Sequence, residues 1–296
     1  MIKINNKSFS YIIFYLFGIS LALIITSCSD LKNDIPAAPQ VSVHKRGILV
    51  KTSPDWHGNL IKDKNWNLEY CQQCHAADFS GGVAGVSCLN CHKNQDGPAA
   101  CNTCHGDFRN VNRIAPPRAI NGDTSNSVLG VGAHTQHLYE NTLGNKVSCS
   151  TCHTVPEKFN SPGHIDGLPV KIILGGQAIS HGATNASYSH ANGTCSNTYC
   201  HGNFTFYKDS TSLRNQFAYT ADKITGTSQS VIWNKVDGSQ IKCGSCHGLP
   251  PAGHITKDIE LKDCAGCHVG VVDEFGNIID KTKHMNGKVD VFGEEE

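Results

Sequence analysis

The chain has 296 residues, of which 15 are Cys and 16 are His, while charged residues make up 17% and aromatic residues 7%. Hydrophobic residues make up 39%, and Gly is abundant at 29 residues, so side chains alone supply little material for the interior of an ordinary globular domain. The formal net charge is 0. It provides no basic field of the kind that binds nucleic acid, and no long charge run or low-complexity repeat indicates a disordered chain.

Residues 1–27 are typical of a secretory signal. Lys3 and Lys7 precede an almost unbroken apolar run at 11–25, which is short for a membrane span. Cys28 follows where a bacterial lipobox would place the Cys that is lipidated and becomes the mature N-terminus. The alternative is a plain signal peptide with an incidental Cys. We expect an exported protein, lipid-anchored to the outer membrane through Cys28 and facing the periplasm or the cell exterior.

The other 14 Cys form seven pairs, and a His directly follows every pair. Two residues separate the Cys of six pairs, and four separate those of the seventh. Composition alone would give about 0.04 C-x-x-C-H sequences in this chain, so the pattern is specific. The groups are Cys71, Cys74 and His75; Cys88, Cys91 and His92; Cys101, Cys104 and His105; Cys149, Cys152 and His153; Cys195, Cys200 and His201; Cys243, Cys246 and His247; and Cys264, Cys267 and His268.

This spacing suits covalent attachment of haem. In c-type attachment each Cys sulfur forms a thioether with one haem vinyl group, and the following His binds the iron as its proximal ligand. Four intervening residues can serve as well if the extra two bulge outward. The motif that ends at His201 has this longer spacing. The sequence therefore predicts seven haem c groups.

Three other interpretations compete. Disulfides are plausible in an exported chain with paired Cys, but they do not explain the His after every pair. The pairs at Cys243/Cys246 and Cys264/Cys267 have the spacing of a four-Cys zinc site, which does not require the His either. A thiol-redox motif would need one pair on a compact α/β domain rather than seven pairs.

Nine His remain as candidate sixth ligands of the irons. His44 lies in the expected tether and is our choice for a non-ligand. After Met1, the chain has Met285 alone, so at least six haems lack the Met ligand that raises cytochrome c potentials and are expected to be bis-His and low-potential. His134 and His137 are three residues apart and would share a helix face, where they might serve two neighbouring haems. The candidate distal ligands are His57, His134, His137, His164, His181, His190, His254 and His284.

The expected fold is mostly irregular, with short α-helices at the attachment motifs, a few short strands and stacked haems as the core. Strands are predicted at 170–174, 230–233 and 289–292. With roughly 38 mature residues per haem, the chain cannot build seven separate cores. The expected parts are a flexible tether at 28–56, a three-haem module at 57–115, a two-haem module at 116–242 with a haem-free lobe or flap at 202–242, and a two-haem module at 243–296.

Five stretches resemble the multihaem c-type cytochromes of metal-reducing bacteria that mix C-x4-C-H and C-x2-C-H motifs. The resemblance implies electron transfer in the periplasm or at the outer surface, often toward extracellular metal oxides, and distal ligation by the Gly-His and His-x-x-His positions. The stretches are 132–138 (GAHTQHL), 149–156, 161–167 (SPGHIDG), 193–202 (GTCSNTYCHG) and 243–254.

Two functions of different classes follow from the motifs. A chain of haems would pass single electrons between redox partner proteins, a porin-like outer-membrane conduit or extracellular metal oxides, and it would bind no nucleic acid. A haem reductase of the nitrite or hydroxylamine type would need one iron with an open site, and the surplus of His argues against it. A scaffold or filament subunit of a conduit is compatible with the first function. We expect an electron carrier rather than an enzyme.

Overall fold

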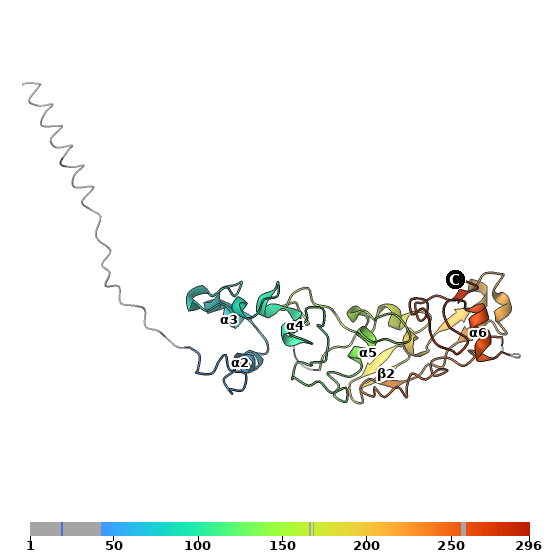
Figure 1. Cartoon of the computed structure of the whole chain (residues 1–296), viewed down its shortest axis with the longest axis horizontal. Helices are drawn as coiled ribbons and strands as arrows, with labels where there is room; N and C mark the ends of the chain where they lie inside the picture. The colour runs from blue at the N-terminus through green and yellow to red at the C-terminus, as the bar shows by residue number, and fades with distance from the viewer. Residues whose placement is uncertain (1–18, 20–42, 166, 168, 256–258) are drawn as a thin grey trace, which may run out of the picture. The chain divides into compact units, whose positions relative to one another are not determined.

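The computed structural model describes residues 19, 43–165, 167, 169–255 and 259–296 (Figure 1). The chain divides into two compact units, Met1–His57 and Gly58–Glu296. The expected signal at 1–27, the lipidation residue Cys28 and the first part of the tether fall outside the described residues, apart from Ile19, and stay predictions. No helix among the described residues has the length and apolarity needed to cross a membrane.

The described part of the first unit is a series of turns. Val50 donates its backbone N–H to the Gly47 carbonyl, and Ser53 donates to the Val50 carbonyl. The backbone N–H of His57 then donates to the Ile48 carbonyl at 2.8 Å. These turns place His57 at the start of helix α2 (His57–Asp63).

Six of the seven attachment motifs contain a short helix, as the sequence predicted, and the Cys243–Cys246 motif forms turns instead. Ser87 and Ser148 cap two of these helices by accepting a backbone N–H two residues on, as short polar side chains do at helix starts. Glu260 and Asp263 form a capping box at the last one. The α-helices are α3 (Glu69–His75), α4 (Cys101–Cys104) and α6 (Leu261–Cys267). The 3-10 helices, labelled η, are η2 (Cys88–Asn90), η4 (Cys149–Thr151) and η6 (Tyr199–His201).

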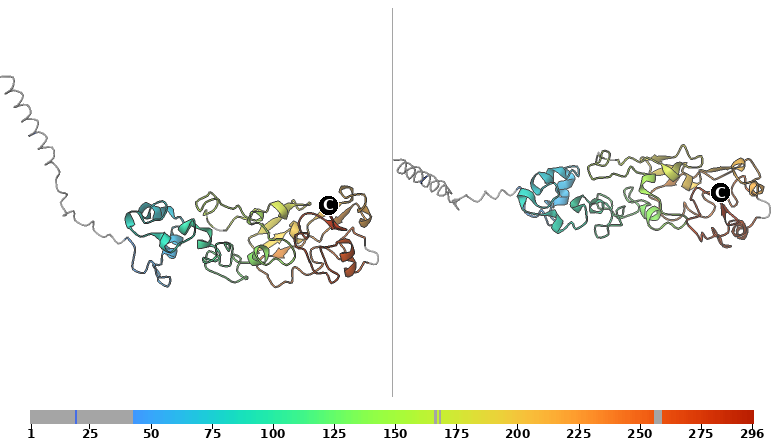
Figure 2. Two further views of the ribbon diagram at one scale, coloured as in Figure 1. Left: turned by 45° about the horizontal axis from the view of Figure 1, so that its top comes forward. Right: turned by 90° about the horizontal axis from the view of Figure 1, so that it is seen from above.

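The remaining helices are equally short and connect the motifs. Figure 2 shows how short the helices and strands are, with irregular chain between most of them. These connecting helices are η1 (Gly82–Ala84), η3 (Gly97–Ala99), α5 (His134–Leu138), η5 (Gly176–Ile179), η7 (Lys208–Ser210) and η8 (Gln216–Ala218).

Strands form three small antiparallel groups. In the first, β1 (Ser187–Ser189) pairs with β2 (Thr194–Ser196), which also pairs with β5 (Val231–Ile232). In the others, β3 (Thr205–Tyr207) pairs with β4 (Lys223–Thr225), and β6 (Asp290–Val291) pairs with β7 (Glu294–Glu295). The expected fold class, mostly irregular with short helices and few strands, is confirmed.

Two of the three predicted strands are present. β5 lies within 230–233 and β6 within 289–292. The prediction of a strand at 170–174 was wrong, because this segment pairs with no strand of the described chain. Its backbone turns to an attachment motif instead, because Ile173 donates its N–H to the Cys152 carbonyl and Gly175 donates to the Thr151 carbonyl, each at 2.9 Å.

Protein side chains fill little of the interior. Val131 is the largest side chain that is fully buried in the described chain, and four of the ten other buried apolar residues are Ala. Large apolar side chains meanwhile remain exposed, among them Val83 at 90% and Leu213 at 87%. A soluble domain of this length normally buries far more apolar surface, and this deficit agrees with a core supplied by another group.

The segment at 202–242, expected to be a haem-free lobe or flap, is connected to attachment motifs on both sides. Its strand β5 pairs with β2 so that Val231 lies opposite Cys195. On the other side, Thr225 of β4 bridges to Ala252, and Tyr219 bridges to His254. The segment therefore helps to position two candidate haem sites.

Candidate haem-binding sites

Four imidazole pairs join a motif His to a His from elsewhere in the chain. The ring centroids are 6.1 Å apart for His105 and His164, and 6.2 Å for His153 and His134. They are 6.2 Å apart for His201 and His137, and 6.4 Å for His268 and His254. In each pair the motif His is a predicted proximal ligand and the other is a predicted distal ligand.

The separation of these rings fits a metal between them. Two imidazole nitrogens bound on opposite sides of one iron, each at about 2.0 Å, place the ring centroids about 6 Å apart. Direct packing of two neutral rings does not require this distance four times over. The donor set thus fits haem, with two thiols beside each motif His and a second imidazole facing it.

A fifth pair is indicated by His247 and His284. Burial, together with the nearby His247, lowers the pKa of His284, so the two side chains are neighbours. His284 reaches this place because its Nδ1 lies 2.5 Å from the Leu143 carbonyl, a contact between segments far apart in the sequence.

Hydrogen bonds orient the candidate distal rings in one way. Six of these His place Nδ1 within 3.1 Å of a backbone carbonyl, to which it donates, and this leaves Nε2 as the nitrogen with a lone pair for iron. The pairs are His57 with Ile48, His134 with Val131, His137 with Ala133, His164 with Phe159, His254 with Ile255, and His284 with Leu143.

The other three His are placed differently. His190 directs Nε2 rather than Nδ1 to a carbonyl, that of Val170, at 2.8 Å. His181 packs between Tyr199 and Phe206, with ring centroids 5.2 and 4.9 Å away. His44, our choice for a non-ligand, is exposed. The assignment of ligand roles to all of these residues stays a prediction.

Burial favours the neutral form of five of these imidazoles. It lowers the pKa of His134 and of His201 to about 4, because a charged imidazolium is disfavoured away from water. Burial lowers the pKa of His105, His153 and His268 in the same direction. A neutral imidazole is the form that binds a metal, so these rings are ready to bind iron without first losing a proton.

Several motif thiols are also shielded from water, although five of the 14 are exposed. All 14 described Cys are free thiols, and burial, with the charge of Cys152, raises the pKa of Cys195 and Cys200 to about 11. An uncharged thioether suits such a place better than a thiolate does. Among the described residues, no three His, Cys, Asp or Glu side chains gather into a site of the zinc type.

Two of the four residues between the Cys of the longer attachment motif turn inward, and the other two are partly exposed. Thr198 is 5% exposed and Tyr199 is 6% exposed. The Tyr199 ring packs against His181, and its hydroxyl accepts the backbone N–H of Gly287 at 3.0 Å. Asn197 takes a left-handed conformation with φ 56° to allow the turn. The loop thus anchors the segment that follows His284.

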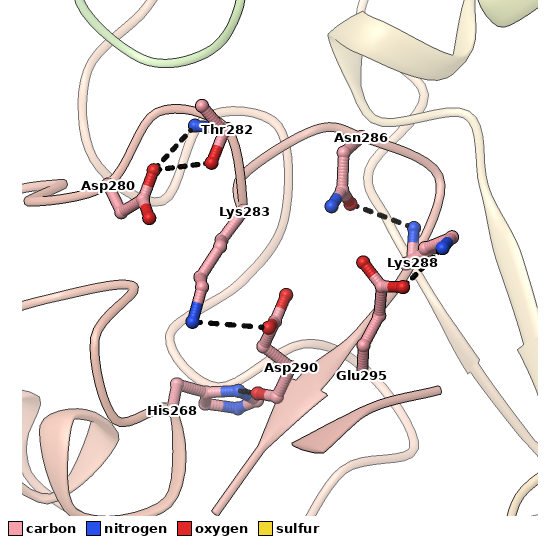
Figure 3. A network of polar contacts seen from close by, with 8 residues as sticks. All are labelled: His268, Asp280, Thr282, Lys283, Asn286, Lys288, Asp290 and Glu295. Atoms are coloured by element: carbon pink, nitrogen blue, oxygen red, sulfur yellow. Dashed lines mark hydrogen bonds and ion pairs between the residues drawn. The ribbon is translucent and has the colours of Figure 1, made fainter. Parts of the chain in front are cut away.

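A buried carboxylate lies beside the last motif (Figure 3). His268 Nδ1 donates to the backbone carbonyl of Asp290 at 2.7 Å, which fixes the plane of the imidazole. The Asp290 side chain is 4% exposed, and its Oδ1 lies 3.7 Å from Lys283 Nζ. Its Oδ2 is buried without a hydrogen-bond partner in the described chain. A negative charge is therefore held close to a predicted proximal ligand.

Sequence reasoning missed three residues that contact candidate ligands: Asp290, Tyr199 and Trp233, whose ring centroid lies 4.8 Å from that of His134. Asp290 falls inside a predicted strand and Trp233 at the end of another, where pattern alone indicates packing. Tyr199 lies between the two Cys of its motif, and an aromatic residue there could have suggested an inward turn.

One comparison with known proteins found a match. Residues 194–247 match a family model described as the Geobacter CxxxxCH...CXXCH motif. These residues belong to that motif family of multihaem cytochromes. The match begins in β2, includes the inward loop and β5, and ends at His247. A search of curated proteins and a search of solved structures each found no match.

The match of residues 194–247 to this family of multihaem cytochromes implies haem c as the cofactor and electron transfer as the general activity. The matched segment includes His201, whose ring faces His137, and both Cys of the longer motif. The family assignment and the imidazole geometry therefore point to the same chemistry from separate observations.

The charge of Asp290 leads to a prediction about one haem. Asp290→Asn keeps the shape of the side chain and the carbonyl that accepts from His268, but it removes a buried negative charge that favours ferric over ferrous iron. We expect the midpoint potential of one haem to rise by on the order of 50 mV, about a tenfold change in a one-electron equilibrium. Spectroelectrochemical titration of the holoprotein measures this shift.

Asp280→Asn is the matched control, because Asp280 lies in the same segment but binds Thr282 at the surface. It should leave every midpoint where it was. Equal shifts in the two variants would show that Asp290 has no particular effect on this site.

Proposed function

We propose that the protein transfers electrons through seven covalently bound c-type haems, most of them bis-His and low-potential, as part of an extracellular electron transfer chain. The observation that carries this proposal is the set of four imidazole pairs 6.1 to 6.4 Å apart, each combining a motif His with a distant His. When bound, each haem would supply an iron that accepts one electron and releases one electron.

The chain's own residues would hold and insulate these groups. The Cys pairs would hold each haem covalently, and the paired imidazoles would bind its iron. Backbone carbonyls at Nδ1 keep each distal ring in the tautomer that binds through Nε2. With both axial positions filled, a substrate has no open coordination site, which favours a carrier over a reductase.

The attachment motifs lie near one another in chain order, which supports transfer from haem to haem. Burial and the charge of Cys88 raise the pKa of Cys71, so the first two motifs are neighbours. Burial and the charges of His164 and His153 lower the pKa of His105, which connects the third motif to the fourth. Between them, Asn94, which follows the second motif, donates its side-chain amide to Oδ1 of Asn102 in the third motif at 2.8 Å.

The later motifs continue the series. Cys200 lies near Cys152 and Cys246, whose charges add to burial in raising its pKa, so the fourth, fifth and sixth motifs adjoin. Burial raises the pKa of Cys264, and the nearby Cys243 adds to this effect, which connects the sixth motif to the seventh. Electrons could thus move by short steps without a mobile carrier.

Location and partners form part of the proposal. The signal at 1–27 and the lipobox-like Cys28 support export and attachment to the outer membrane by lipid. Suitable partners are redox proteins, a porin-like conduit in the outer membrane, or extracellular metal oxides. The chain could act alone or as a subunit of a larger cytochrome conduit.

The haem load tests the cofactor assignment. The mature holoprotein should exceed the mass of its processed polypeptide by seven haem masses plus lipid, because each motif holds one haem by two thioethers. Intact mass spectrometry and a pyridine haemochrome assay measure this. A load of six would implicate the Cys195–His201 motif, and zinc in place of haem would contradict the proposal.

Removal of one distal ring tests bis-His ligation. His164→Ala should leave the iron at His105 with an open axial position, so one haem should become high-spin and bind carbon monoxide when reduced. Electron paramagnetic resonance and carbon monoxide difference spectra measure the change.

His44→Ala is the control for that variant, because the exposed His44 is outside the candidate ligands. It should leave the spectra unchanged. The unaltered protein should bind no carbon monoxide at neutral pH, and stoichiometric binding to one of its haems would favour the reductase instead.

The lipid anchor has its own test. Cys28→Ala removes the sulfur that would carry the lipid, so the protein should leave the membrane fraction or remain unprocessed. Fractionation with immunoblotting and N-terminal mass analysis measure this. A variant that is cleaved at the same site and stays in the membrane would show that Cys28 is not the anchor.

A further inference from the structure

Trp233 contacts both candidate distal ligands of helix α5. Its ring centroid lies 4.8 Å from that of His134, with the planes at 89°, and 5.5 Å from that of His137, with the planes at 31°. His134 faces His153 of one attachment motif, and His137 faces His201 of the next. One side chain thus touches the axial ligands of two different candidate haems.

Three contacts fix the place of Trp233. Its backbone N–H donates to the Gly193 carbonyl at 2.7 Å, and its indole Nε1 donates to the Leu129 carbonyl at 2.9 Å. The third is a close approach to Gly132, where a Cβ would lie 2.0 Å from Nε1. No larger residue fits there without moving the indole. The ring is therefore held both at the end of β5 and at the turn that precedes α5.

We infer that Trp233 is a shared positioning residue, which sets the planes of the distal imidazoles at two adjacent haems. The inference rests on the proposed function, since it requires His134 and His137 to be iron ligands. The Nδ1 bonds of His134 to Val131 and of His137 to Ala133 define the tautomers, but a single hydrogen bond leaves rotation of a ring partly free. The indole supplies the second restraint on each ring.

The two sites differ in a way that makes this restraint measurable. The rings of His134 and His153 are nearly parallel, at 13°, whereas those of His137 and His201 are crossed at 67°. The angle between axial imidazole planes sets the splitting of the ferric iron orbitals. Parallel planes give a rhombic low-spin resonance, and crossed planes give a resonance with a large maximum g value. The two haems should therefore give separate signals.

The test is electron paramagnetic resonance of the oxidised, full-length holoprotein. His137→Ala first assigns the large-g signal of its site by removing it, and His134→Ala does the same for a rhombic signal. In Trp233→Ala both signals should shift or broaden while the haem load stays at its original value. Trp233→Phe keeps an aromatic ring but loses the Nε1 donor, so both signals should shift by less.

Phe217→Ala is the matched control. Phe217 lies in the same segment and stacks on Phe292, with ring centroids 6.2 Å apart. It should leave both signals unchanged. If Trp233→Ala does not accumulate, Trp233→Phe decides: a shift of both signals supports the inference and no shift overturns it.

Other outcomes separate the inference from the function on which it rests. Unchanged signals in Trp233→Ala, a change at one site only, or equal changes in Phe217→Ala would overturn the shared role of Trp233 and leave bis-His ligation intact. Signals that survive unaltered in both His134→Ala and His137→Ala would instead contradict the ligand assignment itself.

Discussion

The pairing of imidazole rings whose centroids lie 6.1 to 6.4 Å apart is the interaction on which the rest of this structure depends. Each pair combines a His fixed beside its Cys pair with one from outside that motif, 59 residues away for His105 and His164 and 14 residues away for His268 and His254. Each such pair brings two chain segments together, as a disulfide does in a small secreted domain. Burial disfavours the charged form of His105 and of His268, so desolvation and the proposed binding of iron favour the same protonation state.

Regular secondary structure is short and sparse because of this pairing of imidazoles. A carbonyl in a long helix or a sheet is already an acceptor for another backbone N–H, whereas carbonyls in turns remain available. The structure uses such carbonyls to bind Nδ1 of candidate ligands, as Phe159 does for His164 and Leu143 for His284. Short helices at the motifs suffice to present Cys and His. Trp233 directly follows β5, and its ring contacts His134 of α5.

The attachment motifs, the irregular fold and the strands at 230–233 and 289–292 could be predicted, because each depends on local spacing or local alternation. The pairing of His depends on contacts between distant segments, and local pattern carries no information about these. The predicted strand at 170–174 does not form for the same reason. Its β-branched residues favour extended backbone, but the segment and the residue after it bind the carbonyls of Cys152 and Thr151 rather than another strand. The inward path of Tyr199 likewise depends on Gly287, far along the chain.

Under the proposed function, the same architecture would couple folding to haem binding. Large apolar side chains are exposed in the polypeptide alone, and Val131 is the largest that its described residues bury fully, so the haems would supply the missing apolar contact. Any group that binds the folded state alone stabilises it, and here each group would also join two distant segments. Because α5 carries candidate ligands for two sites, the contacts that hold the central region together are also those that keep two haems adjacent. Stability and the path of the electrons would thus depend on one set of residues, which explains how so little protein could hold so many redox centres.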